Sequence, residues 1–242
     1  MDPRQIMQLT KAKTGDIGAA FYFDPATLAR GKELGLSGMR FYAIGRGGVL
    51  GDVEPAVVLS AFGYFAPELV AKWWNQAREV MSPRDAAREY IACNHALGRA
   101  KLADLPGLEH YVDAATTVID AVDGGALALF AAVRAEPVPD DTPAAAIHQA
   151  MVLRELRGSA HLAAIAAVGL PTAVAHAIKR PNDVEMFGYP EPPPISDADR
   201  EAHERAETIT DDILAPAYSL LTDDQAAALI AGTDAMHERL VD

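Results

Sequence analysis

The stretch SGMRFYAIGRGGVLGDVEPAVVLSAF, residues 37–62, decides the prediction of the fold class. Residues 37–45 and 53–62 read as helices, because apolar residues recur in them at helical spacing. Four glycines in residues 45–51 predict a turn that joins the two helices (Gly45, Gly47, Gly48 and Gly51). The segment fails as a dinucleotide-binding loop, since Leu50 stands where the third glycine belongs and no strand precedes it.

Helix, glycine turn and helix is the outline of a helix-turn-helix, in which the second helix lies in the major groove of DNA. That second helix would be VEPAVVLSAF, residues 53–62. A helix that reads bases needs Arg, Asn, Gln or Ser on its exposed face, and this helix has almost none of them. The composition therefore argues against sequence-specific reading of DNA by this helix.

Charge is unevenly distributed along the 242 residues. The net charge is −13, but residues 30–101 sum to +3 and residues 102–242 to −16. A surface that grips DNA needs a basic stripe, which only residues 30–101 can offer, and we expect its contacts to come from Arg40, Arg46 and Lys72. The acidic half would repel a polyanion, so the net charge disfavours DNA as a partner. The alternative interpretation is that both segments are solvated helix faces.

The rest of the chain also reads as helix. Proline and glycine fall between periodic segments, and alternating β-branched residues never extend beyond a few positions. Any strands must therefore be short, as in the wing of a winged helix. Residues that can cap a helix start precede several segments (Asp24, Ser82, Asp141, Ser196 and Thr222). Two apolar stripes near the carboxyl end predict helices that pack on the chain itself or on a second subunit (Ala202, Ala206, Ile209 and Ile213; Leu229, Thr233, Met236 and Leu240).

Cysteine content and hydropathy limit the class of protein. A single cysteine, Cys93, excludes an internal disulfide framework and a multi-cysteine metal site. The amino-terminal sequence MDPRQIMQLTKAK lacks the apolar core of a signal peptide. No uncharged apolar stretch reaches the roughly 18 residues that a membrane span needs. We therefore expect a cytoplasmic protein without a membrane partner.

An aromatic-proline motif occurs twice, as AAFYFDPATLA in residues 19–29 and as AFGYFAPELVA in residues 61–71, with a looser third version in residues 186–192. Each version places a proline at a helix start and aromatic residues just before it, where the rings can pack on the first turns of the helix. The alternative is that the aromatic residues line one apolar ligand pocket, whose wall would be Tyr22, Phe23, Phe62, Tyr64, Phe65, Trp73 and Trp74.

The run MVLRELRGSAHLAAIAAVG, residues 151–169, places three polar side chains on one face of an apolar helix. Arg154, Arg157 and His161 follow one another at helical spacing, and such groups need partners in an apolar environment. One hypothesis is a polar-ligand or anion pocket with the arginines as donors and the histidine as donor or base. The other is a buried network of ion pairs to the acidic half, with partners among Glu155, Asp140 and Asp141.

Motifs for metal binding and catalysis are missing from the sequence. There is no HExxH, and His203 and Glu207 share a helix face, but two ligands do not make a zinc site, so we expect no metal. A single histidine among aromatic residues is all that axial haem ligation requires, so haem stays an alternative cofactor. No GxSxG, SxxK or paired-carboxylate signature occurs, which argues against an enzyme.

Two stretches resemble the SalK-like helix-turn-helix family of actinobacteria: AIHQAMVLRELRGSAHLAAIAAVGL (146–170) and GRGGVLGDVEPAVVLSAFGYFAPELVAKWW (45–74). The opening AAFYFDP also fits, so the resemblance covers essentially the whole chain. The family pattern resembles R-E-H-R-G-D-G-H, with Leu156 and Ser159 here in place of a common His and Asp, and it is otherwise matched by Arg154, Glu155, Arg157, Gly158 and His161. The tail from residue 213 to 240 also resembles the last helices of MarR-type winged-helix regulators.

This resemblance implies a mostly α-helical chain of two duplicated winged-helix-like units with short β wings. The units would be residues 1–106 and residues 107–242, with a wing near residues 180–189 and MarR-like carboxyl-terminal helices in the second unit. MarR-type regulators are symmetric dimers, so a tandem would be a monomeric pseudo-dimer or a homodimer.

Three functions stay open at this point. The first is a ligand-binding winged-helix protein that resembles a MarR-type transcriptional regulator. The second is a protein on the same scaffold that binds a small apolar or tetrapyrrole-like molecule without binding DNA. The third is an enzyme of secondary metabolism that uses His161 as acid or base.

Overall fold

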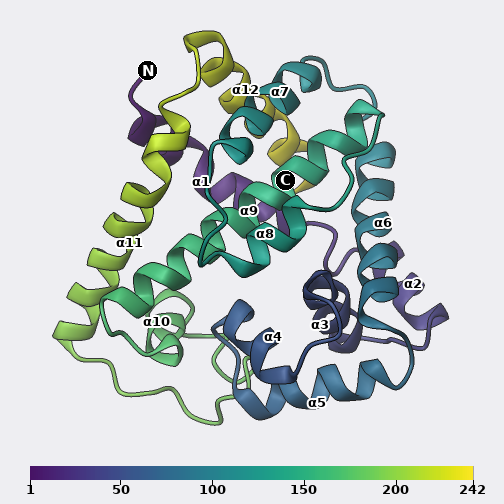
Figure 1. The fold of residues 1–242 in the computed structure, drawn as a ribbon, viewed down its shortest axis with the longest axis vertical. Coiled ribbons are helices and arrows are strands. Elements are labelled where there is room, and N and C mark those ends of the chain that lie inside the picture. The colour runs from purple at the N-terminus through teal and green to yellow at the C-terminus, as the bar shows by residue number, and fades with distance from the viewer. Residues whose placement is uncertain (242) are drawn as a thin grey trace.

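The computed structural model describes residues 1–241, and within this range the chain forms helices and no strand. The predicted mostly α-helical class is confirmed. Figure 1 shows the helices, which are in chain order α1 (Pro3–Ala19), α2 (Pro25–Glu33), α3 (Met39–Gly47), the 3₁₀ helix η1 (Gly48–Leu50), α4 (Pro55–Phe62), α5 (Pro67–Arg78), α6 (Pro83–Lys101), α7 (Leu108–Asp120), α8 (Ala128–Arg134), α9 (Thr142–Ala167), α10 (Thr172–Lys179), α11 (Asp197–Tyr218) and α12 (Asp223–Leu240).

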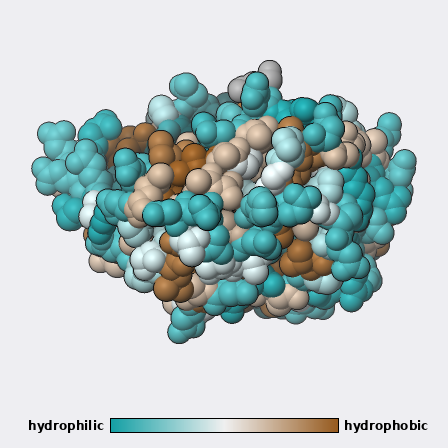
Figure 2. All heavy atoms as spheres, turned by 90° about the horizontal axis from the view of Figure 1, so that it is seen from above, coloured by the Kyte–Doolittle hydropathy of each residue, from teal (hydrophilic) through white to brown (hydrophobic). Residues whose placement is uncertain are grey.

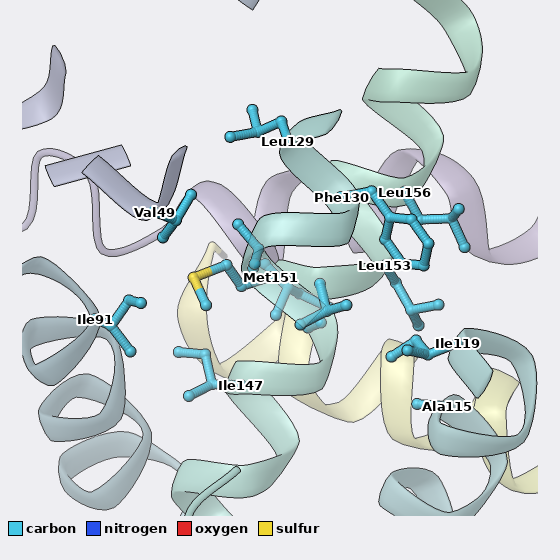
Figure 3. Packing of buried hydrophobic residues seen from close by; sticks show 14 of the residues in the cluster. Val49, Ile91, Ala115, Ile119, Leu129, Phe130, Ile147, Met151, Leu153 and Leu156 are labelled. Atoms are coloured by element: carbon cyan, nitrogen blue, oxygen red, sulfur yellow. The ribbon is translucent and has the colours of Figure 1, made fainter. Parts of the chain in front are cut away.

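Helix α9 is the centre of the fold, and α1, α6, α7, α8 and α11 all pack against it (Figure 1). It begins where the Asp141 side chain accepts a hydrogen bond from the Ala144 amide, and the chain leaves it through Gly169, whose φ is +71°. Figure 3 shows Met151 on the side of Val49 and Leu153 on another side of the helix. A helix that is apolar on nearly all sides belongs in a core.

The glycines of residues 45–51 allow close packing, and the predicted turn there needs correction. Helix α3 continues through Gly47 directly into η1, so the chain turns only at Gly51, which has a φ of +87°. A Cβ atom on Gly45 would lie 2.4 Å from the Tyr90 ring, and one on Gly48 would lie 2.0 Å from the Pro83 carbonyl oxygen. These glycines let α3 and η1 lie directly against α6.

The tight helix-turn-helix lies one helix later than the sequence predicts. Helix α4 ends at Phe62, the next residue, Gly63, has a φ of +81°, and α5 begins at Pro67. Residues 63–66 therefore join two helices that pack on each other, and α3 packs against both of them. Glycine suits this turn because its φ lies in the left-handed region. Helices α3, α4 and α5 form the three-helix unit at the lower edge of the molecule in Figure 1.

The expected β wing near residues 180–189 is not found, because this segment forms turns. Its hydrogen bonds are local, for example from the Phe187 amide to the Asp183 carbonyl at 3.2 Å. The Ala66 amide donates to the Phe187 carbonyl at 2.8 Å, and the Phe187 ring stacks on that of Phe65 at 4.2 Å between centroids. The segment therefore closes over the turn between α4 and α5 instead of pairing with a second strand.

Both halves of the chain contribute to the main hydrophobic core, and a smaller cluster lies between α9, α10 and α11. The main core extends from Ile6 in α1 to Met236 in α12, and α1 packs on α9, α11 and α12. The predicted stripe of α12 is buried in the chain itself at Leu229, Thr233 and Met236, as are the first residues of the α11 stripe. The division after residue 106 stays a prediction, as do the duplication and the choice between a monomeric pseudo-dimer and a homodimer.

Figure 2 shows one face of the molecule, on which hydrophilic residues predominate and hydrophobic ones form separate patches. Within residues 1–241, no single helix is long and apolar enough to cross a membrane. Helices α9 and α10 pass that test only together, as a pair bent by 120°.

Candidate functional site

The outer face of α5 carries the donors that α4 lacks. Val70, Trp74 and Ala77 are buried against the three-helix unit, which leaves a polar face exposed on the other side (Glu68, Lys72, Asn75, Gln76 and Glu79). Asn and Gln are side chains that read bases, and lysine contacts phosphate. In the helix-turn-helix as the structure forms it, the candidate reading helix is α5 and not residues 53–62.

Helix α5 is held in place at the loop that precedes α4. The Trp74 indole nitrogen donates to the Val53 carbonyl at 3.0 Å, and Arg78 lies 3.2 Å from Asp52. These contacts hold the buried side of α5, so its orientation depends on residues 52–53 as well as on apolar packing. A polar face on a helix that is held in place is the geometry that binding in the major groove of DNA needs.

Arg46, expected on the DNA-facing surface, is instead inside the molecule, paired with Glu155 of α9. Its Nε donates to Glu155 Oε1 at 2.8 Å and its Nη2 to Oε2 at 2.7 Å, which is a two-pronged ion pair. Of the other expected DNA contacts, Lys72 is exposed, whereas Arg40 is half-buried and bonds to Ser37. Of the three DNA contacts expected from the sequence, Arg40 and Lys72 are therefore the two that lie near the surface of the three-helix unit.

Glu155 has further partners in this buried cluster. Tyr22 donates to Oε1 at 3.0 Å and Arg154 Nη1 to the same atom at 2.8 Å. Burial acts to raise the pKa of Glu155, but the charges of Arg46 and Arg154 outweigh it and lower that pKa to about 2. Two guanidinium groups thus surround one carboxylate. Arg154 pairs with Glu155, one of the partners that the hypothesis of a buried ion-pair network named.

The space beside this cluster is too small for an organic ligand. The cavity that Tyr22, Arg46, Tyr90 and Glu155 help to line holds about 10 Å³, which is room for about one water molecule. The rings around it pack on one another, for example Tyr22 edge-on to Tyr42 at 5.2 Å between centroids. In this region the aromatic residues act as core.

Arg157 and His161 face a different element from Arg154. Arg157 donates to Glu207 Oε2 at 2.6 Å and to Asp211 Oδ1 at 2.9 Å, and His161 Nδ1 lies 2.9 Å from Thr210 Oγ1. All three partners belong to α11, a helix of the acidic half that the sequence analysis did not name as the partner. Asp141, a partner proposed from the sequence, instead caps α9 and pairs with Arg99 at 2.6 Å.

A groove of about 510 Å³ lies between the helix-turn-helix and the second half of the chain. Helix α4, the turn after it and the start of α5 line one side. The other side is lined by α9 together with Ala126, Ala128, Leu129, Thr172 and Tyr189. Its polar side chains are uncharged: Ser60, Ser159, Thr172 and Tyr189. This volume suits a drug-sized molecule.

The groove is not the pocket predicted from the sequence. None of its described lining residues is Arg154, Arg157 or a histidine. Of the aromatic residues expected in that pocket, Phe65 reaches the groove, and Tyr189 of the third version of the motif reaches it as well. Tyr22 and Phe62 are buried in the core, Phe23 is 54% exposed, and Tyr64 and Trp73 are half-buried. The sequence signal for the groove is a row of small residues on α9, at Ser159, Ala163 and Ala166.

Comparison with known proteins supports the helix-turn-helix. A model described as a helix-turn-helix family matches residues 8–191. The chain belongs to this helix-turn-helix family. A search of curated proteins found no match, and a search of solved structures found none either. The family region contains the three-helix unit, the Glu155 cluster and every residue that lines the groove.

Proposed function

We propose that the protein is a DNA-binding regulator whose α5 enters the major groove, and that a small molecule in the groove beside α4 controls it. The observation that carries this proposal is that the groove wall is the helix-turn-helix itself: Val57 and Ser60 of α4, Gly63 of the turn and Pro67 of α5. A ligand held between this wall and α9 would set the position of α5. The ligand response resembles that of MarR-type regulators.

The polar face of α5 supports the DNA-binding part of the proposal. Asn75 and Gln76 are exposed and can each form paired hydrogen bonds with adenine, and the exposed Lys72 can contact phosphate. The family match to a helix-turn-helix family agrees with this use of the helix. In this proposal the base-reading groups lie on α5, whose position a ligand in the groove would set.

Charge sets the strength of binding that we expect. With a net charge of −13 and two acidic residues on the same face of α5, Glu68 and Glu79, non-specific attraction to DNA is weak. Discrimination must then come from base contacts and not from a general attraction to phosphate. The protein should select a sequence but bind random duplex poorly.

The groove favours an apolar ligand without a full charge. Its walls carry Leu59, Leu129 and Leu162, and no lysine, arginine, aspartate or glutamate is among the described residues that line it. Burying an ion there would leave the charge without a partner. Hydroxyl groups of serine, threonine and tyrosine could orient a ligand that carries a carbonyl or hydroxyl group.

The test is selection of duplexes from a random pool, followed by fluorescence anisotropy of the selected duplex at 50 mM salt. The double variant Asn75→Ala, Gln76→Ala should bind at least tenfold more weakly, since each good base contact contributes about 1–3 kcal/mol of discrimination. The control Gln5→Ala, on the exposed face of α1, should bind like the parent. Failure to enrich any sequence, with no binding at micromolar duplex, would refute the proposal.

A second candidate is a small-molecule binding protein that does not bind DNA, which the net charge and the size of the groove favour. Native mass spectrometry of freshly purified protein would show a retained molecule. Ala166→Trp should fill the groove and abolish retention, whereas Ala167→Trp should not, since both alanines are exposed at the end of α9 but only Ala166 lines the groove. Retention without DNA binding would establish this second function.

A further inference from the structure

Two histidines and a glutamate converge between α9 and α11. The donor atoms of His161, His203 and Glu207 all lie within 4.8 Å of one another. We propose that these three side chains bind a divalent transition-metal ion such as Zn²⁺, with water as the fourth ligand. Two imidazoles and one carboxylate are a ligand set found in open, four-coordinate zinc sites.

The hydrogen bonds of Thr210 determine which nitrogen of His161 faces this cluster. Thr210 Oγ1 lies 2.7 Å from the Ala206 carbonyl and donates its one proton there, so the same oxygen must accept from His161 Nδ1 at 2.9 Å. The proton of the neutral imidazole is then on Nδ1, and Nε2 presents a lone pair. A hydrogen bond from the far nitrogen orients metal-binding histidines in the same way.

His161 Nε2 lies 3.9 Å from Glu207 Oε1. Both atoms are hydrogen-bond acceptors in this tautomer, so a cation between them would satisfy both. Tetrahedral zinc at its usual bond lengths holds its donors about 3.4 Å apart. Small rotations of the side chains would close the present separations to that value.

The backbone supports the same geometry. His203 and Glu207 are four residues apart on α11 and therefore lie on one face, opposite His161 on α9. The two imidazole rings are 5.8 Å apart between centroids and inclined by 76°, so their nitrogens can point at a common centre. Ligands from two packed helices give a site that needs no loop to close.

The surrounding charges leave one carboxylate oxygen available. Arg157 takes Glu207 Oε2 at 2.6 Å, and Lys11 lies 4.0 Å from that oxygen, so Oε1 faces the histidines. Asp211 receives the other arm of Arg157 and lies 3.6 Å from Lys11, which offsets part of the positive charge. The side chains of His161 and Glu207 are 16% and 29% exposed, so an ion and its water can reach them.

The experiment uses the full chain, stripped with a chelator and titrated with Co²⁺, whose visible absorption is much stronger in four-coordinate than in six-coordinate sites. We expect one equivalent to produce these bands and Zn²⁺ to abolish them. Zn²⁺ at 100 times its Kd should also raise the Tm by about 5–10 °C. These readouts are independent of DNA binding.

The matched variants remove one imidazole each. His203→Ala and His161→Gln should each weaken Co²⁺ binding at least 100-fold, whereas His110→Ala, an exposed histidine on α7, should bind like the parent. Circular dichroism checks that each variant is folded, and the two ligand variants test the site separately. Absent bands in the parent, or parent-like affinity in both ligand variants, would overturn the proposal.

Discussion

Arg46 of α3 and Glu155 of α9 form a buried two-pronged ion pair that joins the helix-turn-helix unit to the central helix. Its two hydrogen bonds measure 2.8 and 2.7 Å, and the side chains are 12% and 2% exposed. The pair also sets the chemistry of its neighbours, because Tyr22 and Arg154 both donate to Glu155. The position of α3, and through it that of α4 and α5, depends on this contact.

Arg46→Met should therefore destabilise the protein strongly. It leaves Glu155 buried with only Arg154 and Tyr22, and breaking a buried pair in this way costs about 3–5 kcal/mol. Urea denaturation measures the change in the free energy of unfolding. The double variant Arg46→Met, Glu155→Leu should not restore stability, because Arg154 and Tyr22 then lose the carboxylate to which they donate.

The control for this prediction is Arg88→Ala. Arg88 pairs with Asp85 at 2.7 Å, but both side chains are more than half exposed, so the loss should stay below about 1 kcal/mol. Equal losses of stability in Arg46→Met and Arg88→Ala would mean that the buried pair does not hold the three-helix unit against α9.

Gly48→Ala should destabilise the protein because its Cβ would lie 2.0 Å from the Pro83 carbonyl oxygen, a backbone atom that cannot easily move. We expect a loss of about 1–3 kcal/mol from overpacking. Gly15→Ala is the matched control: Gly15 lies in α1, a Cβ there meets nothing within 4 Å, and the substitution should stabilise by up to about 1 kcal/mol. Thermal denaturation of both variants measures the contrast.

Stability should fall as the pH decreases from about 6.5 to 4. His95 Nε2 lies 3.0 Å from His148 Nδ1, and burial lowers the pKa of each imidazole to about 4. The unfolded chain then binds protons in this window that the folded chain does not, so the stability present above pH 6.5 is lost on acidification. A fully buried histidine would contribute up to about 1.4 kcal/mol per pH unit.

His148→Leu should flatten this decline, which the Tm at several pH values between 7.5 and 4 would show. His110→Leu is the control, because His110 is exposed on α7 and should leave the slope unchanged. A slope that is as steep in His148→Leu as in the parent would show that other groups cause the acid sensitivity.

Binding of the selected duplex should depend only weakly on salt. With Arg40 and Lys72 as the phosphate contacts, the logarithm of affinity should fall with a slope near −2 against the logarithm of salt concentration. Lys72→Ala should reduce that slope by about 1. A slope several times steeper would place the DNA on another surface of the protein.

The elements of the fold are predictable where local rules decide them. Asp141 and Thr222 cap α9 and α12 as expected from their positions before periodic segments. The glycines of residues 45–51 misled the prediction, because a glycine that permits close packing looks in sequence like one that permits a turn. The prediction of a β wing was wrong because residues 180–189 hydrogen-bond to one another and to Ala66 and not to a second strand.

The candidate site was harder to predict because its partners are distant in sequence. Helical spacing correctly grouped Arg154, Arg157 and His161 near one another on α9, but a helix face is broad enough to meet two elements. Arg154 lies over the Tyr22 ring, 4.9 Å from its centroid, and pairs with Glu155, whereas Arg157 and His161 meet α11. Periodicity identifies a face and says nothing of what lies across from it.

By itself, the sequence determined that this chain is helical, where most helices begin, and that its charged α9 side chains need partners. Those properties follow from capping, periodicity and the cost of burying unpaired charge, which act within a few residues. Only the tertiary structure decided that Arg46 meets Glu155, 109 positions away, and that His161 joins His203 and Glu207. These pairings depend on how whole helices pack, since packing brings together side chains that no local pattern connects.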